Sequence, residues 1–246
     1  MQRRSVLAGI AAGLTAGCSK IGQTDAFQSL VDGADRLHRG AHRLIGGPRP
    51  MAPEFTLADL STVFRGNGNT EIDSDEYRTH QTAGFADWQL AVTGLVERPL
   101  GLSLAQLHAL PQRTQITRHD CVEGWSAIGE WTGPQLSNVL KLAGVKPAAR
   151  FAVFHCADDF NGIRYYESCD LDDAMHPQTI VAHTLNGEPL PVKNGAPLRM
   201  RIERQLGYKH AKFLTGIELV ASLAPVFGGQ GGYWEDNVGY QWYAGV

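Results

Sequence analysis

Apolar residues recur at helical spacing near the N-terminus and alternate at strand spacing further along the chain. Between Phe27 and Ile45 they fall three or four residues apart, and Gly46-Gly47-Pro48 ends the pattern. A 3.6-residue repeat places such side chains on one face, so the pattern predicts an amphipathic helix over residues 25–45. The basic residues on its polar face fit either a solvated surface or contact with an anionic membrane or partner.

A proline-rich joint at residues 48–53 separates this helix from a region where short strands dominate. Alternating apolar positions predict strands at residues 88–92, 113–119, 151–156, 198–203 and 217–222. Asn186-Gly187 lies between two extended runs and predicts a type I′ hairpin turn. The aromatic-rich tail over residues 227–246 is expected to fold back over the domain, because a flexible linker would carry few aromatic residues.

Two short helices are predicted among these strands. Ser103, with Gln106 three residues on, fits a capping box and starts a helix. Pro134 is expected to open another helix, which ends at Gly144. Because helices and strands do not alternate regularly, the predicted fold class is α+β, with mixed β-sheets and interspersed helices.

The length of 246 residues suits one large domain with an ample core. The formal net charge is -3, which gives no general basic field. Nucleic-acid binding is therefore not expected, and partners have to be argued from local sites.

Residues 1–18 have the pattern of an export signal. Paired arginines at positions 3–4 precede a small and apolar run over residues 6–17, which is too short to span a membrane. This pairing resembles the twin-arginine signal, which exports folded proteins. Cys18 resembles a lipoprotein cleavage site, and a cleaved signal without lipid is the alternative. We expect a periplasmic protein, tethered to the membrane if Cys18 is lipidated.

Three cysteines remain when Cys18 is set aside, and an odd number in an oxidising compartment leaves at least one free thiol. Cys121 lies in the polar stretch RHDCVEGW, where a functional thiol is as well supported as a structural one. No CxxC or HExxH motif supports zinc, whereas a Cys121-His119 pair is geometrically allowed. A disulfide between Cys156 and Cys169 is a further option that spacing alone does not establish.

Residues 194–212 gather basic and amide side chains that suit a phosphate-bearing ligand; they include Asn194, Arg199, Arg201, Arg204, Lys209, His210 and Lys212. The alternative is a basic outer strand face balanced by acids. The nearby aspartates are interpreted as turn or helix-cap residues without a catalytic role; they are Asp158, Asp159, Asp170, Asp172 and Asp173.

The motifs HDCVEGW, LNGEPLPVKNGAPLR and GYKHAK occur in one order, together with the strand that ends in Cys156. Together they resemble the molybdopterin-binding domain of the sulfite oxidase family over residues 64–246. The resemblance implies a sulfite oxidase-like fold and a molybdenum-molybdopterin cofactor, with Cys121 as the only protein ligand of the metal. It also implies cofactor contacts from Phe64, Arg65, Asn67, Cys156, Asn194, Arg199, His210, Ala211 and Lys212. The match at Cys156 weakens the disulfide option.

Two further residues are assigned to catalysis by the same resemblance. Tyr240, in GYQWYAG, aligns with a tyrosine that faces the metal on the substrate side, and an aromatic that merely closes the core is the alternative. Glu123 stands where vertebrate and plant sulfite oxidases carry a segment with arginine, and a carboxylate there should repel sulfite. The catalytic subunits of periplasmic methionine sulfoxide reductases share the CVExW pattern, although their remaining sequence differs.

The resulting expectation is an exported, monomeric molybdenum oxidoreductase that transfers oxygen atoms in two-electron steps. Its substrate is a small-molecule or protein-bound sulfur compound, and sulfoxide reduction is favoured. The alternatives are a sulfite dehydrogenase that passes electrons to a c-type cytochrome and a metal-free, lipid-anchored binding protein. No haem motif is present, so the redox partner is expected to be a cytochrome or a quinone-linked membrane protein. Residues 19–60 form the expected helix and joint, and residues 61–246 the catalytic domain.

Overall fold

The computed structural model describes residues 24, 27, 33–34, 37–42, 44 and 50–246. The chain divides into two compact units, Met1–Pro50 and Met51–Val246. In the first unit the described residues 33–34, 37–42 and 44 are helical, within the range predicted for the N-terminal helix. The export signal, Cys18 and the rest of that helix lie outside the described residues. Among the described helices, none combines the length and apolar character needed to cross a membrane.

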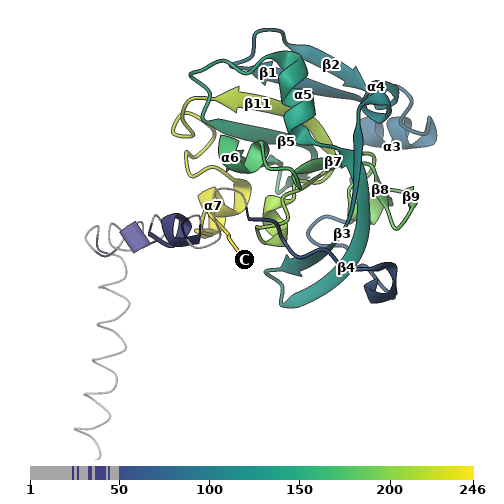
Figure 1. The fold of residues 1–246 in the computed structure, drawn as a ribbon. Helices are drawn as coiled ribbons and strands as arrows, with labels where there is room; N and C mark the ends of the chain where they lie inside the picture. The colour runs from purple at the N-terminus through teal and green to yellow at the C-terminus, as the bar shows by residue number, and fades with distance from the viewer. Residues whose placement is uncertain (1–23, 25–26, 28–32, 35–36, 43, 45–49) are drawn as a thin grey trace, which may run out of the picture. The chain divides into compact units, whose positions relative to one another are not determined.

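The second unit is built on a five-stranded sheet with the order β2-β1-β11-β5-β6 (Figure 1). Its strands are β1 (Gln89–Gly94), β2 (Leu100–Ser103), β5 (Phe151–Phe160), β6 (Ile163–Asp170) and β11 (Leu214–Val220). β1 runs parallel to β11, while the other neighbouring pairs are antiparallel. The sheet is therefore mixed, as the α+β prediction requires.

A second sheet has the order β3-β4-β8-β9, and β10 pairs with β7. The bounds are β3 (Gln112–Cys121), β4 (Trp125–Pro134), β7 (Ile180–Ala182), β8 (Thr184–Leu185), β9 (Glu188–Pro189) and β10 (Arg199–Arg201). β3 and β4 form a long curved hairpin (Figure 1). Asn186 and Gly187 join β8 to β9 with φ of 54° and 78°, so the predicted type I′ turn is confirmed.

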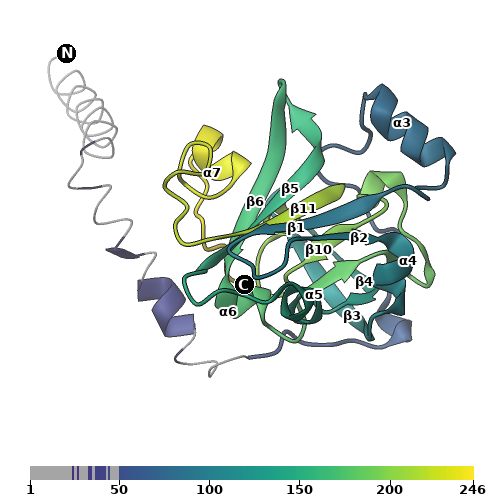
Figure 2. The same ribbon diagram turned by 90° about the horizontal axis from the view of Figure 1, so that it is seen from above.

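Short helices connect the strands: η1 (Leu57–Asp59), α3 (Asp75–Thr82), α4 (Leu104–Ala109), α5 (Leu136–Ala143), α6 (Leu171–Ala174), η2 (Val192–Asn194), η3 (Gly207–Lys209) and α7 (Tyr233–Val238). The predicted capping box of α4 is confirmed, because the Gln106 N–H donates to Ser103 Oγ over 3.2 Å and Gln106 Oε1 accepts from the Ser103 N–H. α5 begins at Leu136 and not at Pro134, since Pro134 still pairs within β4. α7 lies beside β6 (Figure 2).

The main core lies against the five-stranded sheet. Leu136 and Leu140 of α5 are fully buried in it, as are Leu90 and Val92 of β1. A smaller apolar cluster lies under the β3-β4 hairpin and contains Phe64, Trp131, Ile180 and Leu185 among others. The two clusters hold the sheets in place, and the ends of their strands carry the candidate site.

The disulfide option for Cys156 and Cys169 is wrong. In the β5-β6 register Cys169 pairs with Ala152, which is four residues before Cys156 on the same strand. At the usual rise of a strand, this offset places the two cysteines about 13 Å apart along the strands. A disulfide needs Cα atoms about 4.4–6.8 Å apart, so both thiols are free.

Candidate functional site

A cavity of about 140 Å³ brings together five segments that are distant in the sequence. They are the loop over residues 67–69, the end of β3 with its turn, the β5-β6 hairpin, residues 207–212 and the tail around α7. Six residues proposed from the sequence line this cavity: Asn67, Cys121, Glu123, His210, Lys212 and Tyr240. The fold therefore places half of the proposed site residues around one cavity.

The other proposed residues lie behind or beside the cavity wall. Phe64 packs on Trp131 with ring centroids 5.0 Å apart, and the backbone oxygen of Arg65 accepts a hydrogen bond from Asn194 Nδ2 over 3.1 Å. Cys156 lines a neighbouring cavity. Ala211, Asn194 and Arg199 are buried.

Cys121 is the last residue of β3 and is only 7% exposed. The Gly124 N–H donates to the Cys121 carbonyl over 3.0 Å, and Gly124 has φ of 87°, so a tight turn follows the thiol. Burial raises the pKa of the Cys121 thiol, while the backbone N–H of Glu123 and the charge of Arg199 oppose this rise. Coordination by a soft metal would hold the sulfur as thiolate.

Arg199 is a fully buried cation. Its Nη1 donates to the Asn194 carbonyl over 3.0 Å and its Nη2 to the His210 carbonyl over 3.4 Å. Its Nε has no hydrogen-bond partner, and no described carboxylate forms an ion pair with it. Burial, followed by the charge of Arg201, lowers the pKa of Arg199 to about 9. A buried guanidinium in this state suits an anionic ligand.

Lys212 fixes the loop over residues 67–69 against the cavity. Its ammonium donates to the carbonyls of Asn67 and Asn69, and Lys193 O lies 3.5 Å away. Burial, followed by the charge of Arg199, lowers the pKa of Lys212 to about 7. Like Arg199, Lys212 has no carboxylate ion-pair partner in the described part of the chain.

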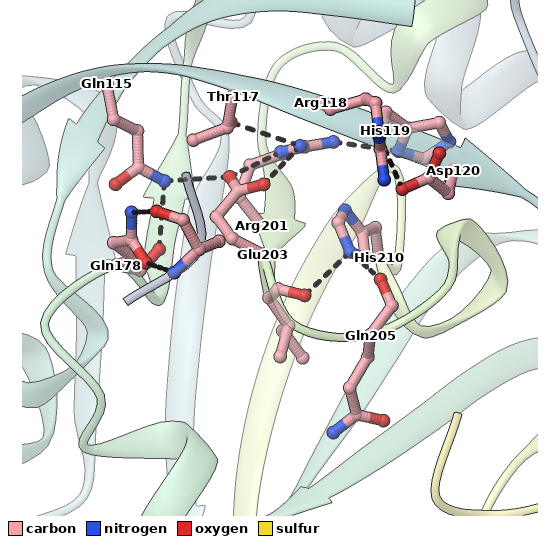
Figure 3. Close-up of polar contacts among 12 residues, drawn as sticks. Gln115, Thr117, Arg118, His119, Asp120, Gln178, Arg201, Glu203, Gln205 and His210 are labelled. Carbon is pink, nitrogen blue, oxygen red and sulfur yellow. Dashed lines mark hydrogen bonds and ion pairs between the residues drawn. The ribbon is translucent and has the colours of Figure 1, made fainter. Parts of the chain in front are cut away.

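The neighbouring Arg201 is neutralised within the protein (Figure 3). Its guanidinium pairs with Glu203 through contacts of 2.9 and 2.5 Å, and both side chains are fully buried. Arg201 Nη1 donates to His119 Nδ1 over 2.9 Å, which assigns the ring proton of neutral His119 to Nε2. Burial and then Arg201 hold the pKa of His119 well below its usual range. Arg201 is therefore part of the framework.

His210 presents an acceptor to the cavity. Its Nε2 lies 2.9 Å from Ile202 O and 3.0 Å from Gln205 O, so this nitrogen carries the proton (Figure 3). Burial, followed by the nearby arginines, holds the pKa of His210 well below its usual range. The neutral ring leaves Nδ1 as an acceptor with no partner in the described structure.

Several buried polar atoms around the cavity lack a hydrogen-bond partner among the described residues; they are Asn67 Oδ1, Asp158 Oδ1, Asn194 Oδ1, Arg199 Nε and His210 Nδ1. Buried polar atoms in proteins are nearly always paired, so these atoms can hydrogen-bond ordered water or a bound polar ligand. The two cations Arg199 and Lys212 add a preference for negative charge. This donor and acceptor set fits a pterin that carries a phosphate. The described residues hold no group of three or more His, Cys, Asp or Glu placed to bind a metal ion.

Some lining residues were missed or misread in the sequence. Asp158 was expected in a turn, but β5 extends to Phe160 and places Asp158 in the strand, where it is buried. Position 158 shares a strand face with Cys156, and this period-two relation was an available signal. Tyr165 was not singled out; its hydroxyl donates to Tyr208 O over 2.6 Å. Trp234 stacks on Tyr240 with centroids 5.9 Å apart, and the aromatic tail was correctly expected to fold back.

Comparison with known proteins identifies related sequences. Residues 77–227 match the family model described as oxidoreductase molybdopterin binding domain. The YedZ1 protein of Azospira oryzae, which carries the name of a protein-methionine-sulfoxide reductase subunit, is 36% identical over 245 residues, covering 100% of this chain and 86% of the relative. The protein-methionine-sulfoxide reductase catalytic subunit MsrP of Xanthomonas campestris is 35% identical over 181 residues, covering 68% of this chain but only 56% of the relative. MsrP of Gluconobacter oxydans is 35% identical over 219 residues, covering 80% and 70% of the two chains.

The sulfane dehydrogenase SoxCD of Paracoccus pantotrophus has a similar solved structure. Its TM-score is 0.52 at 24% sequence identity, and the match covers 56% of this chain and 39% of that chain. At this identity the likeness concerns the fold. The predicted fold class is confirmed.

Proposed function

The chain belongs to the family of oxidoreductase molybdopterin-binding domains, and on this premise we propose that it is the catalytic subunit of a molybdenum enzyme that reduces sulfoxides. The observation that carries the proposal is the Cys121 thiol, which is buried, free and part of the cavity wall. The un-neutralised Arg199 and Lys212 support it, because they supply positive charge for the phosphate of a pterin.

Each proposed cofactor contact has a distinct task. Cys121 would hold the metal, and the positive charges of Arg199 and Lys212 would attract the pterin phosphate. His210 Nδ1 and Asn194 Oδ1 would accept hydrogen bonds from the pterin ring, since both atoms otherwise lack partners. Once bound, the cofactor would supply the two-electron oxygen-atom exchange.

The cavity wall favours a neutral substrate over an anion. The Glu123 side chain and the aromatic rings of Trp234 and Tyr240 line it. Glu123 accepts hydrogen bonds from Trp125 Nε1 over 3.0 Å and from the Gly68 N–H over 3.4 Å. Such a wall disfavours the sulfite dianion and so the sulfite dehydrogenase alternative. A sulfoxide carries no net charge, and the named relatives are methionine sulfoxide reductases.

Location and partners extend the same proposal. The twin-arginine-like signal supports export of a folded, cofactor-loaded protein to the periplasm, with a lipid tether at Cys18 as an option. Electrons would come from an external cytochrome or quinone-linked membrane protein, and the name catalytic subunit, given to the relatives, fits a separate redox subunit.

The test is molybdenum content per chain in protein purified from the exported fraction, for wild type, Cys121→Ser and Cys169→Ser. Cys169 is a matched control because it is a buried free thiol in the core. We expect nearly stoichiometric molybdenum in wild type and Cys169→Ser, and its loss in Cys121→Ser. Reduction of methionine sulfoxide by reduced viologen and oxidation of sulfite by ferricyanide then separate the two substrates. Folded wild-type protein without molybdenum would contradict the enzyme proposal and favour the metal-free binding protein.

A further inference from the structure

We propose that Asp158 is the catalytic acid of this cavity and delivers a proton to the oxygen that leaves the substrate. The proposal rests on the proposed reduction of sulfoxides. In that reaction the S=O bond breaks, two electrons and two protons are consumed, and the oxygen leaves as water. The electrons come from the external haem or quinol-linked partner, or from reduced viologen in the test. The protons have to come from groups in the cavity or from solvent.

The position of Asp158 carries the inference. Its side chain is only 2% exposed, yet it lines the same cavity as Cys121. The β5-β6 register shifts between His155 and Asp159, so Asp158 lies at an irregularity in the strand pair. Such irregularities often redirect a side chain near a functional site.

The two oxygens of Asp158 have different surroundings. Oδ2 accepts a hydrogen bond from Asn69 Nδ2 over 3.1 Å, which fixes the orientation of the carboxyl group. Oδ1 is buried and has no partner among the described residues. A carboxyl group that is anchored through one oxygen and unoccupied at the other is arranged to hold a proton at Oδ1 and give it to a ligand.

Other lining residues have their protons committed to the protein. The Lys212 ammonium donates to loop carbonyls, and the Tyr165 hydroxyl donates to Tyr208 O. His210 donates through Nε2 to backbone oxygens and presents an unprotonated nitrogen. Glu123 accepts two hydrogen bonds. Tyr240 also lines the cavity and carries a hydroxyl proton. The test therefore has to distinguish Tyr240 from Asp158 as the proton donor.

The charges around Asp158 are consistent with a proton donor. Ionisable groups face it from several elements: Tyr77, Glu123, Cys156, Asp159, Tyr165 and Lys212. Burial raises the pKa of Asp158 to about 6, although the Asn69 hydrogen bond and Lys212 act in the opposite direction. A general acid works best when its pKa lies near the operating pH, and an aspartate with an ordinary pKa would hold no proton there.

The test compares Asp158→Asn with Asp159→Asn in cofactor-loaded enzyme. Asp159 is a matched control because it is the adjacent, exposed aspartate, and its Oδ1 accepts from the Gly162 N–H over 3.1 Å, which an Asn side-chain oxygen can also do. Turnover of methionine sulfoxide with reduced viologen is measured over about pH 5 to 8. Wild-type kcat is expected to fall as pH rises above the pKa of Asp158, because only the protonated acid donates. Molybdenum content is measured in parallel for every variant.

We expect Asp158→Asn to retain molybdenum, lower kcat by about 10²- to 10⁴-fold and lose the pH inflection. Asp159→Asn is expected to keep kcat and an inflection, which shifts towards lower pH because the Asp159 charge helps to raise the pKa of Asp158. Asp158→Glu should recover part of the rate and an inflection, which separates loss of the acid from loss of structure. A carboxyl C=O infrared band that titrates near pH 6 in wild type and is absent in Asp158→Asn reports the proton independently of turnover.

Two results would overturn the assignment to Asp158. One is an Asp158→Asn enzyme with a nearly wild-type kcat and pH profile. The other is loss of the inflection in Tyr240→Phe but not in Asp158→Asn. A molybdenum-loaded wild type that reduces no sulfoxide at any pH contradicts the proposed function itself, and the inference falls with it.

Discussion

At the residue scale, the basic side chains in β10 and in the segment that follows it differ in whether a carboxylate neutralises their charge. Arg201 pairs with buried Glu203, and Lys209 pairs with Glu167 and Glu235. Arg199 and Lys212 donate hydrogen bonds only to backbone carbonyls and contact aromatic rings, and neither forms an ion pair with a carboxylate in the described structure. Arg201 and Lys209 therefore stabilise the fold, whereas Arg199 and Lys212 leave positive charge for a ligand.

Arg201→Met is expected to lower the free energy of unfolding by about 3–5 kcal/mol, because it leaves the buried Glu203 carboxylate without its cation. Urea unfolding of the purified protein measures this. Arg78→Met is the matched control: Arg78 pairs with Asp73 and Asp75 on the surface, so the loss should be within about 1 kcal/mol.

The double variant Arg201→Met/Glu203→Leu should recover much of this stability, since no unpaired buried charge remains. Equal losses in Arg201→Met and Arg78→Met would contradict the view that burial makes the Arg201-Glu203 pair important.

Sequence motifs identified residues of the candidate site but did not show which of its charged side chains are neutralised by a partner. Cys121, His210 and Lys212 were each proposed from a motif and do line the cavity. The i, i+2 spacing of Arg201 and Glu203 in the predicted strand already allowed this pair. The sequence could not show that the carboxylate contacts Arg201 and leaves Arg199 without an ion pair, because that depends on side-chain directions in the folded chain.

At the element scale, α7 is attached to the sheet by a buried ion cluster. Lys209 of η3 contacts Glu167 of β6 and lies 2.7 Å from Glu235 of α7. Trp242 Nε1 donates to Ser168 Oγ over 2.8 Å and fixes the chain beyond the helix. The residue before Glu235 is Trp234, which lines the cavity. The cluster therefore holds one wall of the site in place.

Lys209→Met is expected to loosen α7, because the two buried carboxylates lose the cation between them. Hydrogen exchange of the backbone amides in α7 should become at least about tenfold faster, while the amides of β11 stay protected. Lys141→Met, at an exposed position of α5, provides the control. Unchanged exchange in α7 after Lys209→Met would show that apolar packing alone holds the helix.

Strand positions were predicted better than strand ends. Alternation located β1, β5 and β11, because one face of each is buried in the core. The continuation of β5 through Asp158 to Phe160 was missed, since a run of two aspartates has the composition of a turn. Pairing with β6 across the hairpin overrides that local preference.

At the scale of the whole molecule, buried histidines couple stability to pH. Burial lowers the pKa of His183 to about 4 and holds those of His119 and His210 well below the usual value. In the folded state these rings bind fewer protons than in the unfolded chain below pH about 6.5. Their contribution to stability is therefore lost as pH falls from about 6.5. The raised pKa of Asp158 acts in the opposite direction and favours the folded state as pH falls through about 6.

His210→Gln isolates one of these contributions. The glutamine amide can still donate to a backbone oxygen but does not titrate, so the stability advantage of wild type over the variant should shrink as pH falls. Urea midpoints of cofactor-free protein at about pH 7 and about pH 5 measure the change, which is at most about 1.4 kcal/mol per pH unit. An advantage that is constant or grows towards acid pH would contradict a neutral buried His210.

The loop clamp made by Lys212 has a consequence for the order of assembly. Lys212 Nζ holds the carbonyls of Asn67 and Asn69, so one rim of the cavity is in place only when an early segment has met a late one. Another part of the cavity wall is formed by Trp234 and Tyr240, which are synthesised later still. A nascent chain still on the ribosome has no complete cavity before those residues emerge. A complete cavity therefore requires that distant parts of the chain have folded together.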